Sequence, residues 1–216
     1  MIHIQSFVFN AFQENTYVLF DETKECVIID PGCYDDYEKK ELTDFVEHND
    51  LHVKALLNTH GHIDHVLGND FVKEKYHTKL YIHNVDDAVL KSVKAYASNY
   101  GFPKYHEATP DIYLKEGDLI LFGNQQLNVL FVPGHSPGHI AFYSVENKII
   151  IGGDVLFRSS IGRTDLPGGD FDTLIRSIHT QLFTLPDDVT VYPGHGPETT
   201  IGIERLTNPY CALTAH

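Results

Sequence analysis

Thr59-His60-Gly61-His62-Ile63-Asp64-His65 is the most informative stretch of the sequence, and it directly follows the apolar run Val53-Lys54-Ala55-Leu56-Leu57-Asn58. Residues two apart on an α-helix point to nearly opposite sides, so the first two histidines could not bind one ion from a helix. Zinc ligands on one helix are instead spaced as in H-E-x-x-H. We therefore expect a tight loop at the end of a strand. In such a loop His60 and His62 converge on one point, while the Asp-His pair after them aims at a second point nearby.

The chemistry of this stretch is that of a two-metal site. Two imidazoles can hold one ion, and the pair Asp64 and His65 supplies a carboxylate and an imidazole to another. The alternative is a histidine-rich surface loop without a function, in a chain that contains 14 His. A strand followed by His, His, Asp and His in a fixed order disfavours that alternative.

The heptapeptide resembles the H-x-H-x-D-H signature of the metallo-β-lactamase-fold hydrolases. The resemblance implies two further histidines and a bridging aspartate, each after its own strand. His135, Asp154 and His195 meet this expectation, since each follows a predicted strand and a glycine. A carboxylate can hold one metal on each oxygen, so Asp154 is the expected bridge. The resemblance thus implies the metal ligands His60, His62, Asp64, His65, His135, Asp154 and His195.

The resemblance covers nearly the whole chain and implies an α/β fold. This fold is a metallo-β-lactamase αββα four-layer sandwich, formed by a single domain over residues 1–216, with both metals at one sheet edge. Strands are expected at 2–9, 16–20, 26–30, 53–58, 80–83, 119–122, 127–132, 140–144, 148–153 and 189–192. Helices are expected at 35–48, 68–76, 85–97 and from Asp170 or Asp172 to 182, with a short helix starting at Glu198. Residues 99–111 and 155–169 are expected to be loops.

Composition and charge bound the function. The chain has 16 Lys+Arg against 30 Asp+Glu and a formal charge of −14, which leaves little material for a basic surface and disfavours nucleic acid as a partner. No run has the length of a membrane-spanning helix, and the first residues show no signal peptide. Cys26, Cys33 and Cys211 lack the spacing of metal ligands and suit reduced thiols in a cytoplasmic protein. We expect no membrane partner, and the sequence leaves the oligomeric state open.

Several polar residues near the expected ligands have more than one interpretation. Asp30 ends a predicted strand before Pro31-Gly32. It either supports the metal loops from behind, as the resemblance implies, or simply forms a turn. His139 begins a strand, and we interpret it as a packing residue or as a support for a ligand. His77 and His83 lie at a helix end and a strand end, which are ordinary structural settings.

The stretch Gly152–Asp170 is similar to the short single-domain relatives of glyoxalase II, which are hydroxyacylglutathione hydrolases. This resemblance implies hydrolysis of a small-molecule thioester such as S-lactoylglutathione to a hydroxy acid and free glutathione. Two divalent ions, with zinc expected and iron or manganese as alternatives, would lower the pKa of a bridging water and bind the carbonyl under attack. Asp64 would orient the resulting hydroxide. A thiolate is a good leaving group, so little acid catalysis by the protein is required.

Arg163 is the second candidate catalytic residue, and its role has two interpretations. Arg163 and Asp165 stand where glyoxalase II has a lysine and a tyrosine after the bridging aspartate. The planar guanidinium of Arg163 suits a substrate carboxylate. It suits equally a salt bridge to Asp165 or Asp170 that fixes the loop. Full-length glyoxalase II also has a C-terminal helical segment that helps to hold glutathione, and this chain ends shortly after His195, which predicts weak glutathione binding.

Two other functions remain open at this point. Persulfide dioxygenase shares the fold and a similar Gly-Arg-Thr-Asp loop but uses a single iron and O₂. Its ligands would be His60 or a close neighbour, His135 and Asp154. The alternative of another class is a non-catalytic metal-binding protein, which the complete ligand set disfavours because such a protein needs no open coordination position. The lack of a signal peptide disfavours an exported β-lactamase.

Overall fold

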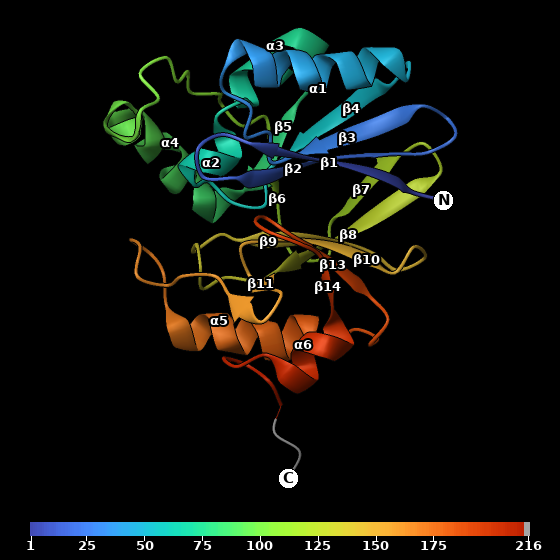
Figure 1. Ribbon diagram of the computed structural model, residues 1–216, viewed down its shortest axis with the longest axis vertical. Helices are drawn as coiled ribbons and strands as arrows, with labels where there is room; N and C mark the ends of the chain where they lie inside the picture. Colours follow the sequence, from blue (N-terminus) through green and yellow to red (C-terminus); the bar gives the residue numbers. More distant parts are fainter. Residues whose placement is uncertain (214–216) are drawn as a thin grey trace.

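The computed structural model describes residues 1–213. Two six-stranded sheets pack face to face at the centre of the molecule, and helices cover the two outer faces (Figure 1). The helices of the first half of the chain lie over one sheet, and those of the second half lie over the other. The chain therefore folds as the four-layered αββα sandwich expected from the sequence.

The first half of the chain builds one sheet and its helical layer. In spatial order, the sheet contains β1 (His3–Phe9), β2 (Glu14–Phe20), β3 (Glu25–Ile29), β4 (His52–Leu57), β5 (Leu80–His83) and β6 (Ile112–Leu114). The helices are α1 (Asp36–His48), α2 (Ile63–Val66), α3 (Asn69–Tyr76) and α4 (Asp87–Tyr96), with the short turns η1 (Asn84–Asp86) and η2 (Ala97–Tyr100). Strands β3 to β6 run parallel. Their carboxyl ends therefore meet at one edge of the sheet, where ligand sites of such sheets lie.

The second half of the chain builds the other sheet. In spatial order, it contains β14 (Thr199–Thr200), β13 (Thr190–Pro193), β10 (Ile149–Gly153), β9 (Ile140–Ser144), β8 (Gln125–Phe131) and β7 (Leu119–Phe122). The remaining elements are the hairpin of β11 (Leu156–Phe157) and β12 (Ser160–Ile161), the helices α5 (Phe171–Ser177) and α6 (Ile201–Thr207), and the turn η3 (Ile178–Leu182). Strands β8, β10 and β13 point in the same direction, because β9 is antiparallel to β8 and β10 while β13 is parallel to β10.

Hydrophobic side chains fill three interiors between the four layers. Alternation along β3 shows how one strand serves two of them. Ile28 packs against the helical layer, whereas Val27 and Ile29 pack between the two sheets. The third interior lies beneath α5 and η3 and includes Leu174 and Ile178. The loops at the shared sheet edge therefore rise from a base that is packed on both faces, which keeps side chains on those loops in place.

The predicted helix starts are largely confirmed, with one correction. Helix α1 begins after Asp35, whose carboxylate accepts backbone N–H groups of the first turn. Helix α5 begins after Asp170, which accepts the N–H of Thr173 at 2.7 Å, so Asp170 rather than Asp172 is the N-cap. The last helix begins at Ile201 rather than at Glu198, because Thr199 and Thr200 first pair with β13 as β14.

The short strands were not expected from the sequence. Strand β6 pairs with β5 at the sheet edge, and β11 pairs with β12 inside the stretch expected to be a loop. Each has two or three residues, which is too short for a periodic pattern to be recognised. None of the helices within residues 1–213 is long and apolar enough to span a membrane.

Candidate metal centre

The stretch Thr59–His65 is a loop only in its first part. Thr59 to His62 connect β4 to the single turn of α2, and Asp64 and His65 lie within that turn. Consecutive residues on a helix point about 100° apart, so these two side chains leave the backbone in different directions. The two points toward which the ligand side chains were expected to converge are therefore separated by the change from loop to helix, rather than by a loop alone.

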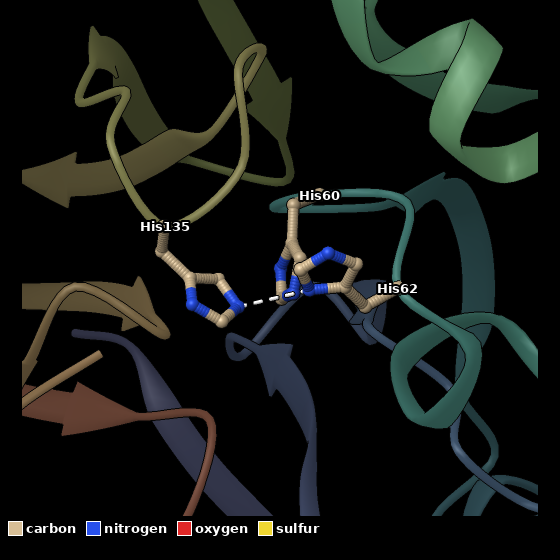
Figure 2. Close-up of side chains that lie close together, drawn as sticks. All are labelled: His60, His62 and His135. Carbon is tan, nitrogen blue, oxygen red and sulfur yellow. Dashed lines mark hydrogen bonds between the residues drawn. The ribbon is translucent and has the colours of Figure 1, made fainter. Parts of the chain in front are cut away.

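Three imidazoles form one set of possible ligands. Figure 2 shows His60 and His62 on one loop and His135 on a loop that faces it. His62 Nδ1 lies 2.9 Å from His135 Nε2, and the ring of His60 lies 4.7 Å and 4.9 Å from the other two rings, centroid to centroid. Burial holds the pKa of His60 well below its usual range and lowers the pKa of His62 to about 4. Both rings are therefore neutral at pH 7, which is the form that binds a metal.

Two of the ring nitrogens of this set, His62 Nδ1 and His135 Nε2, share a hydrogen bond that an ion bound between the rings would replace (Figure 2). His135 Nδ1 lies 2.7 Å from the carbonyl oxygen of Arg163. A carbonyl only accepts, so Nδ1 carries a proton, and Nε2 is the ring nitrogen that faces His62. His60 Nδ1 lies 3.0 Å from Thr59 Oγ1, which leaves its Nε2 on the side of the other rings. A hydrogen bond to the far ring nitrogen commonly fixes a histidine that binds a metal.

A second set combines a carboxylate with two imidazoles. His195 Nε2 lies 3.1 Å and His65 Nε2 lies 3.6 Å from Asp64 Oδ2. Burial alone would lower the pKa of both histidines, but nearby carboxylates more than offset it, and both pKa values are raised. Burial alone would likewise raise the pKa of Asp64, and the charge of His65 and the hydrogen bond from His195 lower it instead. This set is thus held together by charge, unlike the three-imidazole set.

Asp154 lies between the two sets. Its Oδ1 is 3.5 Å from His65 Nε2, and its Oδ2 is 3.4 Å from His135 Nε2 and 3.6 Å from His195 Nε2. The charges of the surrounding histidines overcome the effect of burial and lower the pKa of Asp154, so it is ionised at neutral pH. All seven residues that the sequence analysis named as metal ligands are therefore brought together, with the expected bridge in the middle.

The donor atoms fit divalent cations. Three buried atoms of the cluster have no hydrogen-bond partner within residues 1–213, and these are His60 Nε2, His65 Nε2 and Asp154 Oδ1. Leaving a buried polar atom unpaired costs about 1–3 kcal/mol. Imidazole nitrogens and carboxylate oxygens that face one another in this way are the ligands of zinc and of other first-row transition metals. The three-imidazole set and the mixed set each have the composition of a metal site.

Asp30 supports the cluster from behind. Its carboxylate accepts the backbone N–H of Thr59 at 2.7 Å and the Thr59 hydroxyl at 2.6 Å, and it lies 3.1 Å from His65 Nδ1. It also lies near His60, but its oxygens are already engaged by Thr59 and by the far side of His65. Asp30 adopts a left-handed backbone conformation, with φ of 49°, which aspartate tolerates. Of its two interpretations, support of the metal loop agrees with these contacts.

His139 also lies behind the ligand atoms rather than among them. Its ring stacks on that of His60, with centroids 4.6 Å apart and planes 19° from parallel. Its Nε2 accepts the backbone N–H of Asp154 at 3.1 Å. His139 thus contacts one residue of the three-imidazole set and the expected bridge, in agreement with the interpretation of a packing or supporting residue.

Glu14 is a residue of this region that the sequence analysis missed. It is fully buried in β2, its Oε2 accepts the Thr16 hydroxyl at 2.8 Å, and its Oε1 lies 3.9 Å from His65 Nδ1. Burial raises the pKa of Glu14 well above its usual range. The sequence carried no signal for it, because a glutamate beside Gln13 and Asn15 is typical of an exposed turn.

Arg163 lies at the rim of the cluster and is bound to Asp165. Its Nε donates to Asp165 Oδ1 at 2.7 Å and its Nη2 to Asp165 Oδ2 at 2.8 Å. Both side chains are more than half exposed, at 61% and 69%. This is the loop-fixing pair that the sequence analysis offered as one interpretation. The backbone of the same residue reaches the cluster, because its carbonyl holds His135 Nδ1.

Comparison with known proteins gives consistent matches over most of the chain. Residues 9–195 match the family described as the Metallo-beta-lactamase superfamily. A hydroxyacylglutathione hydrolase, GloC of Haemophilus influenzae, is 39% identical over 97% of this chain and 98% of its own. The crystal structure of BLEG-1 B3 metallo-beta-lactamase has a TM-score of 0.87 and 36% identity, covering 98% of this chain and 99% of that one. The crystal structure of TTHA1623 in a di-iron-bound form has a TM-score of 0.84 and 37% identity, covering 95% and 99%.

Proposed function

The chain belongs to the metallo-β-lactamase superfamily, and we propose that it is a dinuclear metal-dependent hydrolase of thioesters, with S-lactoylglutathione as a representative substrate. The similarity to GloC of Haemophilus influenzae, a hydroxyacylglutathione hydrolase, supports this substrate class. The three thiols are buried and free within the described part of the chain, which suits a reducing compartment such as the cytoplasm.

The placement of Asp154 is the single observation that carries the proposal. Its carboxylate faces both ligand sets at 3.4 to 3.6 Å, with Oδ2 near His135 and His195 and Oδ1 near His65, which suits a carboxylate shared by two ions. In this proposal one ion is held by His60, His62 and His135, and the other by Asp64, His65 and His195, with Asp154 between them. Zinc is the expected metal, and the di-iron form of TTHA1623 makes iron the first alternative. Two bound divalent ions would supply a hydroxide nucleophile at neutral pH and polarise the carbonyl under attack.

Side chains of the protein would orient the attacking water and the substrate. Asp64 Oδ2 faces His65 and His195, so its carboxylate can accept a hydrogen bond from the attacking water and direct its lone pair at the carbonyl carbon. The leaving group is a thiolate, and the low pKa of its conjugate thiol removes the need for a side chain that protonates it. Arg163 would bind a carboxylate of the substrate by exchanging it for Asp165, since both are planar acceptors of a bidentate pair.

Metal analysis beside two activity assays tests this proposal. We expect about two transition metals per chain, hydrolysis of S-lactoylglutathione measured by thiol release, and no oxygen uptake with glutathione persulfide. A protein that never binds more than one iron and consumes oxygen with the persulfide would be a dioxygenase instead. A protein that binds metal but turns over neither substrate would contradict the thioesterase assignment and favour another hydrolase of the superfamily.

A further inference from the structure

We propose that Asp86, a residue outside the two ligand sets, is the positioning residue that sets the metal affinity of the three-imidazole set. It does so by tying the loop of His60 and His62 to the loop of His135. The inference rests on the metal centre proposed above. Asp86 is the last residue of η1, directly after β5, and its side chain is fully buried.

The carboxylate of Asp86 collects hydrogen bonds from both loops. Its Oδ2 accepts the backbone N–H of Gly61 at 2.5 Å. Its Oδ1 accepts the backbone N–H of Gly138 at 2.7 Å. The hydroxyl of Ser136 lies 2.7 Å and 2.9 Å from the two oxygens. Gly61 stands between His60 and His62, and Ser136 follows His135, so the bonds to these two residues are one residue away from a ligand, while Gly138 lies three residues after His135.

The two loops also pack closely against the backbone of η1 and α4, which leaves them little room to shift. A Cβ atom on Gly138 would lie 2.4 Å from the backbone nitrogen of Asp86. A Cβ atom on Gly61 would lie 2.6 Å from the backbone nitrogen of Leu90. A Cβ atom essentially never lies closer than 3.0 Å to the heavy atoms of a neighbouring residue. The carboxylate and the glycine contacts therefore act together to hold both loops against one rigid segment.

The loops come from different sheets, so their separation is not fixed by strand pairing within one sheet. The loop of His60 and His62 follows β4 of the first sheet, and the loop of His135 follows β8 of the second. One backbone hydrogen bond, from Ile140 N to Thr59 O at 2.9 Å, joins them at their base. Asp86 joins them at the ligands themselves. A metal that needs nitrogens from both loops would bind most tightly when that distance is set in advance.

Asp86→Asn is the sharpest test because it keeps the shape and removes one acceptor. Each oxygen of Asp86 faces a backbone N–H group, so the amide of an asparagine must point its own N–H₂ at one of them. In either orientation one of the two loops loses its hydrogen bond to this side chain, and its backbone N–H then faces the N–H₂ group of the asparagine. Asp87→Asn is the matched control, since Asp87 makes the same charge change next door while its carboxylate pairs with Lys91 on the surface of α4.

The experiment measures zinc affinity by competition with a chromogenic chelator, and the melting temperature of the protein stripped of metal. We expect Asp86→Asn to weaken one of two zinc ions by about 10–100-fold, the usual effect of losing a group that orients a ligand. The other zinc and the Asp87→Asn control should stay within about threefold of wild type. The loss should persist in an Asp64→Asn background, where the mixed set is disabled and the remaining zinc reports the three-imidazole set.

Two outcomes would overturn the inference. If Asp86→Asn lowers the melting temperature of the stripped protein but leaves both zinc affinities equal to those of the control, Asp86 is a support of the fold alone. If Asp86→Asn does not fold, Ser136→Ala removes one hydroxyl and leaves the carboxylate in place, and an unchanged zinc affinity in that variant would also count against the inference. A wild-type protein that binds no zinc would refute the proposed metal centre instead, which separates the two failures.

Discussion

Two buried aspartates, Asp86 and Asp21, join the halves of the chain at opposite ends of the sandwich. Asp86 links the two ligand loops at the metal edge. Asp21 directly follows β2, a strand that begins beside His195 and runs away from it. The carboxylate of Asp21 accepts the backbone N–H of Thr23 at 3.0 Å, and from the second half of the chain it accepts the N–H of Asn124 at 2.7 Å. Both aspartates thus gather donors from both halves.

The pKa values of the two aspartates move in opposite directions. At Asp21 burial raises the pKa, but the hydrogen bonds from Thr23, Asn124 and Gln125 together outweigh it and lower the pKa to about 2. At Asp86 burial outweighs the hydrogen bonds and raises the pKa. A lowered pKa means that folding favours the charged carboxylate, and a raised pKa means that the fold holds the charge at a cost. A buried aspartate that accepts hydrogen bonds from both halves of the chain therefore stabilises the edge remote from the metal site. At the metal edge the corresponding aspartate is charged at a cost in free energy, as expected of a functional site.

Loss of a carboxylate at the metal edge should have the greatest effect on activity. Asp154→Asn should reduce turnover of S-lactoylglutathione by about 10³-fold or more, because an amide cannot bridge two cations as a carboxylate does. The fold should survive, as judged by circular dichroism, since Asp154 belongs to none of the three hydrophobic interiors. Both metals should bind more weakly in elemental analysis. Near-normal turnover in this variant would remove the proposed mechanism.

The far edge should show the reverse behaviour. Asp21→Asn is expected to lower the free energy of unfolding by about 1–3 kcal/mol, because one donor of the Thr23 and Asn124 network loses its charged acceptor. Zinc affinity and turnover should equal those of wild type, because Asp21 lies at the end of β2 remote from the ligands. Urea denaturation and chelator competition measure the two quantities. A loss of zinc affinity would show that the two edges are coupled and would contradict the separate roles of Asp21 and Asp86.

The contrast between these aspartates also explains how far the sequence predicts the site. His60, His62, His135 and His195 stand out because each follows a strand and is set in a short, unusual motif. The fold was expected from the resemblance that those motifs carry, and in the structure parallel strands bring their carboxyl ends to the edge where the motifs meet.

The sequence around Asp86 gave no comparable indication that this residue belongs to the site. Within Asn84-Val85-Asp86-Asp87 it has the composition of an ordinary helix start. Its partners Gly61, Ser136 and Gly138 are distant in sequence. The pairing of β4 with β5 brings Gly61 to it, and the packing of the two sheets brings Ser136 and Gly138. Glu14 was missed for the same reason, because its burial depends on the opposing loops.

Acid should erase the contribution of Asp21 to stability. The pKa of Asp21 is about 2 in the folded chain and near its ordinary value of 3.8 in the unfolded chain. The stabilisation is therefore fully present above the ordinary value and is lost as the pH falls through the folded value. The stability difference between wild type and Asp21→Asn should shrink steadily between about pH 4 and pH 2. Urea titrations on protein stripped of metal keep metal loss out of this comparison, and a difference that stays constant over that range would contradict the prediction.

The smallest effect is expected at Arg163, which lies on the metal edge but is bound to Asp165 on the surface. An exposed ion pair contributes about 0–1 kcal/mol, so Arg163→Ala should change the melting temperature little. If Arg163 anchors a substrate carboxylate, KM for S-lactoylglutathione should rise by about 3–10-fold while kcat stays close to wild type, because uniform binding is lost. Asp165→Ala is the matched control. It breaks the same ion pair but frees the guanidinium, so KM should not rise. If Arg163→Ala and Asp165→Ala instead lower the melting temperature equally and leave KM unchanged, Arg163 only fixes the loop that holds His135.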